Sequence, residues 1–253
     1  MGIHERKERE FQRREQEILN AALELFTSDE WQTATIEQIA QRAEIGKGTV
    51  YKHFASKDEI YARLALDFQR RVLATLRGID PTLGVLDKLR EAIRCVFEAH
   101  RAMGPEHQRV LQYYERREFW KALSESTRGE IMAQRAEFDA FIGDIVQQGI
   151  DEGLFPRKPI TRLTFGPEAT VVGAIQRQWL RCDPTADPQG LRCDFGVNAE
   201  EYLEEITCFI LAGMMHQDEV RAPKRSSALR ASHDGREQHT DGAGTSASLR
   251  EEE

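Results

Sequence analysis

The residues best suited to chemistry lie in one short basic segment, residues 41–57. Four basic residues accompany a single acid there, a local charge of +3, whereas the 253-residue chain carries −8 from 35 Lys and Arg against 43 Asp and Glu. Ammonium groups pair with phosphates, and tyrosine and histidine donate hydrogen bonds to phosphate oxygens. The candidate phosphate-binding residues are Lys47, Tyr51, Lys52, His53 and Lys57. The segment therefore predicts contact with double-stranded DNA.

Three further residues suit the same role. Gly48 permits close approach of the backbone, so that free amides of a first helical turn can meet a phosphate. Thr49 is short enough to touch a base edge or a thymine methyl in the major groove. We also expect Thr35 to contact a phosphate while its hydroxyl caps a helix.

Helices must position these side chains, because the apolar residues recur at intervals of three and four. One helix is predicted over residues 18–26, and a second follows Thr35, where Gln38 completes a capping box. A third element spans residues 47–54 and turns Val50 and Phe54 inward. Two short helices joined by a short turn and crossed by a first helix form a helix-turn-helix unit.

The rest of the chain also predicts helices, so the fold class is all-α. Ser56 caps a long helix from residue 57 to about 77, and further helices are expected at roughly 83–102, 105–115, 117–125, 127–152, 160–181 and 199–217, with a surface loop over 181–198. We divide the chain into an N-terminal arm (1–14), a DNA-binding domain (15–61), a ligand-binding and dimerisation domain (62–218) and a disordered tail (219–253), because the tail has almost no large apolar residue.

The residues Thr35-Ile36-Glu37-Gln38-Ile39-Ala40, Gly46-Lys47-Gly48-Thr49-Val50-Tyr51-Lys52-His53-Phe54 and Ser56-Lys57-Asp58-Glu59-Ile60 resemble the N-terminal domain of the TetR family of bacterial transcriptional repressors. The resemblance covers residues 15–61 without a gap. It implies that the third helix enters the major groove and that Thr49, Tyr51, Lys52, His53 and Lys57 contact DNA. The family commonly has glycine where this chain has Glu30 and Glu44, so either these residues accept strain or the local turns differ.

The arm carries balanced charges. Five basic residues, Arg6, Lys7, Arg9, Arg13 and Arg14, alternate with as many acids. The arm could reach DNA, but a solvated helix extension is the favoured interpretation.

The same resemblance implies a helical sensor domain that pairs with a second copy through its last two helices, where Gly173, Ala174, Ala212 and Gly213 allow close approach. A homodimer would present two reading heads to a palindromic operator. The candidate lining of an effector pocket is Phe97, Tyr113, Tyr114, Trp120, Phe138, Phe141 and Trp179. Such residues also serve as ordinary core.

The arrangement of residues 112–117, 153–155 and 165–179 is similar to the fatty-acid-responsive branch of the family. That similarity implies acyl-CoA or a fatty acid as the effector, with Arg116 and Arg117, or a neighbouring basic residue, meeting the phosphates of acyl-CoA. Aromatic or drug-like molecules are the alternative. The predicted mechanism is repression released when a ligand tilts the helix over residues 57–77.

Other classes lack their signatures. Residues 5–10 are charged where a signal peptide needs apolar residues, and no segment is apolar enough to span a membrane, so we expect a cytoplasmic protein without a membrane partner. No spacing fits a metal site, a cofactor loop or a catalytic motif, so we expect neither cofactor nor enzyme activity. A structural DNA-binding protein without sequence preference would need a strongly basic chain.

Overall fold

The computed structural model describes residues 2–26, 33–114, 116–181 and 198–216. Every regular element in these segments is a helix: α1 (Ile3–Leu25), α2 (Ile36–Arg42), α3 (Lys47–His53), α4 (Lys57–Leu76), α5 (Val85–Arg101), α6 (Pro105–Tyr114), α7 (Arg117–Ala122), α8 (Glu125–Asp151), α9 (Ile160–Arg181) and α10 (Ala199–Met215). The all-α class is therefore confirmed. The predicted loop over 181–198 and the tail from residue 219 fall almost wholly outside the described residues.

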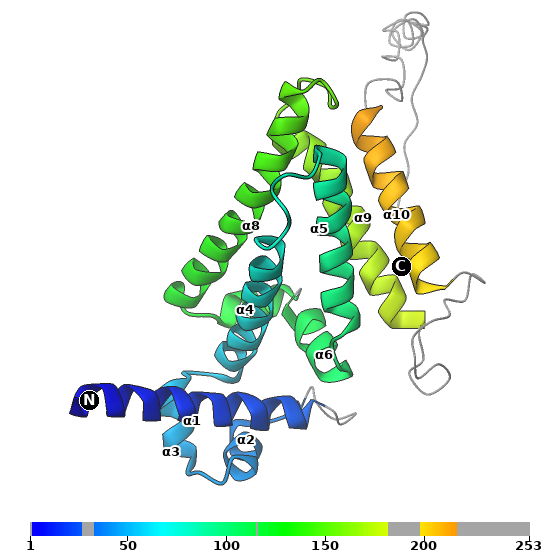
Figure 1. Cartoon of the computed structure of the whole chain (residues 1–253). Coiled ribbons are helices and arrows are strands. Elements are labelled where there is room, and N and C mark those ends of the chain that lie inside the picture. Colours follow the sequence, from blue (N-terminus) through cyan, green and yellow to red (C-terminus); the bar gives the residue numbers. More distant parts are fainter. Residues whose placement is uncertain (1, 27–32, 115, 182–197, 217–253) are drawn as a thin grey trace, which may run out of the picture. The chain divides into compact units, whose positions relative to one another are not determined.

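The first three helices form the predicted helix-turn-helix unit, with α1 lying across α2 and α3 (Figure 1). The capping box of α2 is present, because the Thr35 hydroxyl accepts from the Gln38 amide at 3.2 Å and the Gln38 side chain accepts from the Thr35 amide at 2.8 Å. Ile39 and Val50 are fully buried. The spacing of apolar residues thus fixes which face of α3 remains outside.

The turn between α2 and α3 places Glu44 in the left-handed region, with φ of 55°. The amide of Glu44 donates to the carbonyl of Gln41 at 3.1 Å, and the amide of Ile45 donates to that of Ala40 at 3.0 Å. These two bonds make a Schellman motif, whose left-handed residue is usually glycine. Of the two alternatives for Glu44, the structure therefore shows the strained one; Glu30 lies outside the described residues.

Glu44→Gly should stabilise the protein. Glycine removes the contact of Cβ with the following carbonyl, and part of that gain is offset by the greater entropy of glycine in the unfolded chain. We expect the free energy of unfolding to rise by about 0.5–1 kcal/mol and the melting temperature by about 2 °C. Thermal unfolding measures the change. Glu44→Ala, which removes the charge but keeps Cβ, is the control and should give no such gain.

Helix α4 connects the helix-turn-helix unit to the remaining helices (Figure 1). The Ser56 hydroxyl caps it by accepting from the Glu59 amide at 3.2 Å, as predicted. Its buried residues Ile60 and Tyr61 belong to one apolar cluster that runs from α1 through α4 to Phe119 and Ile131. Because this cluster crosses the boundary placed after residue 61, the division into two domains stays a prediction.

Helices α5, α8, α9 and α10 share a second apolar cluster, which includes Val85, Val146, Leu163 and Leu211. Helices α9 and α10 lie side by side (Figure 1). Pro167 lies inside α9 and deprives that helix of one backbone donor. None of the described helices combines the length and the apolar character needed to cross a membrane.

Candidate DNA-binding surface and ligand cavity

The outward face of α3 displays the side chains that the sequence singled out. Tyr51 is 49% exposed, and Lys47 and Lys52 are exposed as well. A Cβ added at Gly48 would meet no atom within 4 Å, so the first turn of α3 is open to a close neighbour. Thr49 is half-buried, and its amide donates to the Gly46 carbonyl at 2.8 Å. The outward face of α3 is thus accessible to a ligand and carries basic side chains.

Lys47 is held by an acid of the preceding helix. Its ammonium donates to Glu37, and its Nζ lies 5.6 Å from the centre of the Tyr51 ring. The hydrogen bond raises the pKa of Lys47 and lowers the pKa of Glu37. Exposed ion pairs of this kind contribute little net stability, so a phosphate can compete with Glu37 for the ammonium.

His53, the last residue of α3, is half-buried beneath an aromatic side chain of α1. Its ring stacks on Phe11 with 4.1 Å between ring centroids and 29° between the planes. Burial lowers the pKa of His53, with a smaller opposing contribution from Glu15. The neutral ring therefore offers a hydrogen bond rather than a charge near pH 7.

Thr35 and Lys57 lie at the starts of α2 and α4. The Thr35 hydroxyl accepts the α2 capping bond and retains a proton that it can donate. The Nζ of Lys57 lies 5.6 Å from the Tyr61 ring centre, and burial lowers its pKa.

The N-terminal arm is a regular part of α1. Its basic side chains are exposed except Arg14, which is half-buried, and several pair along the helix, as Arg14 does with Glu17 at 2.8 Å and Arg13 with Glu17 at 3.4 Å. The arm therefore extends α1 as an exposed helix of mixed charge, and the absence of a role in DNA binding stays a prediction.

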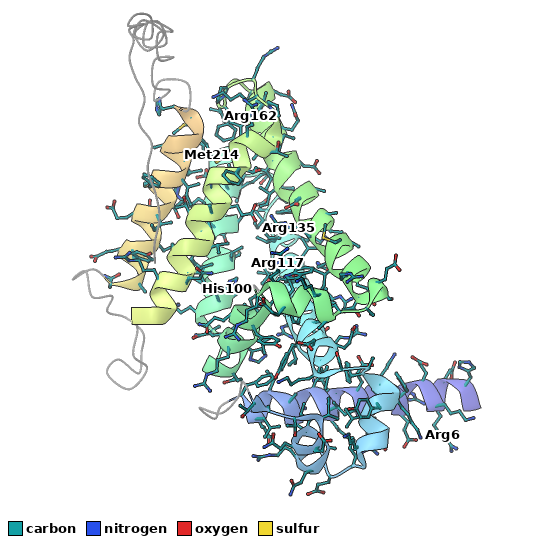
Figure 2. The ribbon with its side chains drawn as sticks, turned by 180° about the vertical axis from the view of Figure 1, so that it is seen from behind. Arg6, His100, Arg117, Arg135, Arg162 and Met214 are labelled. Carbon is teal, nitrogen blue, oxygen red and sulfur yellow. The ribbon has the colours of Figure 1, made fainter. Side chains whose placement is uncertain are left out.

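A cavity of about 820 Å³ lies mainly among α4, α5, α8, α9 and α10, with residues of α6 and α7 also bordering it. Of the predicted aromatic lining, Tyr114, Trp120 and Phe138 border it. Figure 2 shows His100, Arg135 and Met214, which also border the cavity, on α5, α8 and α10 respectively. The lining is mainly apolar, as expected for a small-molecule site.

Three residues of the predicted aromatic lining, and the two arginines predicted to meet phosphates, do not border the cavity. Phe97 packs with Ala174 and Ile175 of α9, and the Tyr113 hydroxyl donates to Asp58 at 2.9 Å. Phe141 packs into the apolar clusters of α5 and α8. Arg117 is exposed at the start of α7, and Arg116 lies over the Tyr113 ring at 5.3 Å. The side chain of Trp179 lies outside the described part of the chain.

Two polar features of the cavity escaped sequence reasoning. His100 is held by its Nδ1, 2.7 Å from the Val96 carbonyl, and burial lowers the pKa of its ring. Arg135 of α8 contacts Asp139 at 3.0 Å and also pairs with Glu168 of α9. The spacing of four residues between Arg135 and Asp139 is a signal from which their pairing could have been predicted. The contact of Arg135 with Glu168 of α9 leaves no such signal in the sequence.

The edge of the cavity between α8 and α9 combines exposed apolar side chains with an ion pair. Met132 and Phe165, both bordering the cavity, are 61% and 75% exposed. Exposed apolar side chains beside a cavity offer area that a ligand could cover. The Arg135–Glu168 pair joins the two helices at this edge.

Comparisons with known proteins agree with this geometry. The model of bacterial regulatory proteins of the tetR family matches residues 18–64, and the model of a tetracyclin repressor-like C-terminal domain matches residues 82–172. The HTH-type transcriptional repressor KstR2 of Mycobacterium tuberculosis is 30% identical over 140 residues, which are 55% of this chain and 68% of that protein.

Two solved structures share the fold. A bacterial regulatory protein of the tetR family from Rhodococcus RHA1 is 18% identical with a TM-score of 0.61, covering 79% of this chain and 96% of that one. The fatty acid degradation regulator FadR from Bacillus halodurans is 16% identical with a TM-score of 0.59 and the same coverage.

Proposed function

This chain belongs to the TetR family of bacterial regulatory proteins and is a ligand-responsive DNA-binding regulator, and from that premise we propose that it is a dimeric repressor released from a palindromic operator by an apolar or amphipathic effector. KstR2, the relative with 30% identity, is named a transcriptional repressor. The regulator acts in the cytoplasm, where bacterial DNA lies.

The outward face of α3 carries the DNA-binding proposal. Its exposed lysines and Tyr51 stand in a segment of local charge +3, so this face attracts phosphates although the chain as a whole carries −8. The candidate contacts are Thr35, Lys47, Gly48, Thr49, Tyr51, Lys52, His53 and Lys57. One recognition helix contacts one half-site of a palindromic operator. A second copy of the chain is therefore needed to contact the other half-site.

The second copy is proposed to pack on α9 and α10. Phe209 of α10 is 68% exposed, and Gly173, Ala212 and Gly213 are exposed on the same two helices. Small residues permit close approach of helices, and an exposed phenylalanine offers apolar area to bury. An isologous pairing would bring two α3 helices to one operator.

The effector is proposed to occupy the cavity among α4, α5, α8, α9 and α10. Its interior offers neutral polar groups, such as Tyr114 and His100, whereas its charged groups stand at the edge near Arg135. A buried unpaired charge is costly, so the buried part of the effector should be uncharged. An acyl chain with its charged end at the α8–α9 edge fits, and FadR is named a regulator of fatty acid degradation. Arg135 would then take the role that the sequence gave to Arg116 or Arg117.

Ligand and DNA are coupled through α4. Its first turn contacts α6 through Asp58 and Tyr113, at 2.9 Å, and α8 through Glu59 and the Ser124 amide, at 2.7 Å. Val72 of the same helix borders the cavity. An effector releases DNA only to the extent that it prefers the non-binding conformation, and typical coupling factors are about 5- to 150-fold.

Fluorescence anisotropy with the DNA upstream of the protein's own gene tests this function. At fixed salt, the wild type should bind that DNA more tightly than a scrambled duplex, and Tyr51→Ala should weaken binding by about tenfold, because one phosphate contact and its aromatic support are lost. Tyr51→Phe, which removes only the hydroxyl, is the matched control and should lose less. Equal binding of both duplexes, unchanged in Tyr51→Ala, would instead indicate a structural DNA-binding protein.

A further inference from the structure

One turn of α1 contacts both the recognition helix and the polar network of α4 and α8. Phe11 and Glu15 are four residues apart, so they lie on the same face of the helix. Phe11 stacks on His53 of α3, and Glu15 pairs with Arg63 of α4. The match to the family model begins at residue 18, so this turn precedes it.

The contact between Phe11 and His53 is specific in its geometry. The ring planes are inclined by only 29° with 4.1 Å between the centroids, while Phe11 remains 45% exposed. A phenylalanine so exposed adds little to the core, and its buried face covers the last residue of α3. The charged side chains around His53 are Glu15 and Arg14 of α1 and Lys52 of α3. Phe11 thus restricts the ring that is proposed to meet a phosphate.

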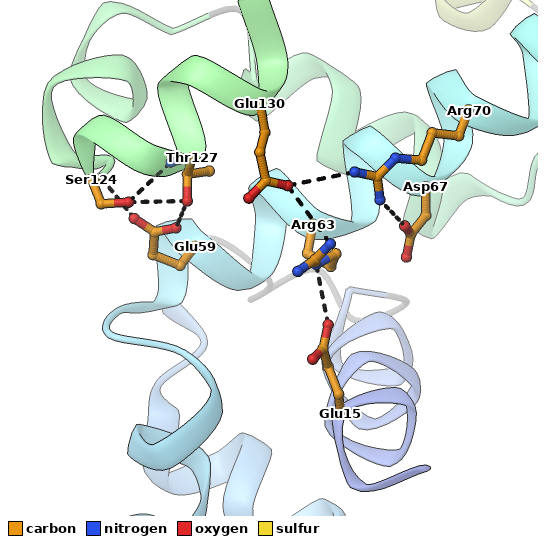
Figure 3. Close-up of polar contacts among 8 residues, drawn as sticks. All are labelled: Glu15, Glu59, Arg63, Asp67, Arg70, Ser124, Thr127 and Glu130. Carbon is orange, nitrogen blue, oxygen red and sulfur yellow. Dashed lines mark hydrogen bonds and ion pairs between the residues drawn. The ribbon is translucent and has the colours of Figure 1, made fainter. Parts of the chain in front are cut away.

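Glu15, at the other end of this turn of α1, is connected to α8 through Arg63 of α4. Arg63 Nε lies 3.1 Å from Glu15, and Arg63 Nη1 lies 3.9 Å from Glu130 of α8 (Figure 3). Arg70 lies about two helical turns after Arg63 on α4, and its guanidinium is 3.5 Å from the same Glu130 carboxylate. Glu130 precedes Ile131 and Met132, which border the cavity.

The start of α8 is held to α4 by a second contact. Glu59 accepts hydrogen bonds from the Ser124 amide at 2.7 Å and from the Thr127 hydroxyl (Figure 3). The first turns of α8 are therefore fixed to α4 at Glu59 and Glu130, and α1 is joined to that assembly through Arg63. A charge network of this kind constrains orientation more than a single exposed pair does.

We propose that the turn from Phe11 to Glu15 is a positioning element for DNA binding, which orients the end of α3 through Phe11 and is itself held against α8 through Glu15, Arg63 and Glu130. This role rests on the proposed DNA binding. The contacts of Phe11 with His53 and of Glu15 with Arg63 together prevent α1 from rotating about its own axis. The His53 ring, which stacks on Phe11, is therefore held in place as well.

Operator binding by variants of the full chain tests the role, with melting temperature measured alongside. Phe11→Ala should weaken operator affinity about fivefold or more with little change in melting temperature, whereas Phe11→Tyr, which keeps the stacking ring, should retain it. Glu130→Gln should weaken affinity about twofold to threefold. Glu137→Gln is the matched control, because Glu137 also joins α8 to α4, through Arg77 at 2.8 Å, but among the described residues it forms no ion pair or hydrogen bond with α1 or with Arg63.

A double variant shows whether Phe11 and Glu130 affect operator binding through the same element or independently. Effects of distant, independent sites multiply, so Phe11→Ala with Glu130→Gln should weaken affinity by less than the product of the single effects if the turn links them. Unchanged affinity in Phe11→Ala, a strictly multiplicative double variant, or equal effects of Glu130→Gln and Glu137→Gln would overturn the role. A wild type that binds no DNA would overturn the proposed function together with this role.

Discussion

Phe209→Asp is expected to turn the dimer into a monomer and to lower operator affinity by about 100-fold or more. Phe209 is 68% exposed on α10, the helix proposed to pack against its counterpart. In an isologous dimer each interface residue occurs twice, so the substitution places two carboxylates in an apolar seam. A monomer binds one half-site and loses the effective concentration that the second head supplies.

Light scattering after gel filtration measures the mass, and anisotropy measures the affinity. Phe165→Asp is the matched control, because Phe165 is also a highly exposed phenylalanine, 75% exposed, but borders the cavity edge between α8 and α9. That variant should remain a dimer. A dimeric Phe209→Asp protein with wild-type affinity would show that the subunits pair elsewhere.

The helices were predictable because local chemistry specifies them. The Thr35–Gln38 capping box and the Ser56 cap set the starts of α2 and α4 within one residue. The start of α1 was harder to place. Residues 3–14 alternate charges without an apolar stripe, so periodicity carries no signal there, and the helix continues through ion pairs along its surface.

The cavity was less predictable than the reading head. The outward face of α3 follows from burying Val50 and Phe54, whose spacing is local. Among the aromatic residues predicted to line the cavity, by contrast, Phe97 packs in the core and Phe138 borders the cavity, although the two residues look alike in the sequence. Only packing between helices separates the two cases, and the Arg135–Glu168 contact between α8 and α9 depends on the same packing.

Ile142→Trp is expected to weaken the ligand response by about tenfold or more while operator binding persists. Ile142 of α8 borders the cavity and is distant in sequence from the reading head, so the larger indole occupies space that an effector needs. N-phenyl-1-naphthylamine, whose fluorescence rises in apolar sites, should bind the wild type and be displaced by oleoyl-CoA.

In Ile142→Trp, the probe signal should fall and release of the operator by oleoyl-CoA should require about tenfold more ligand or more. Ala133→Trp is the matched control, since Ala133 is exposed on the same helix and does not border the cavity. That variant should bind the probe normally. If both tryptophan variants kept the probe signal, the effector site would lie outside this cavity. A tryptophan that fills the cavity would then affect probe binding no more than a tryptophan outside it.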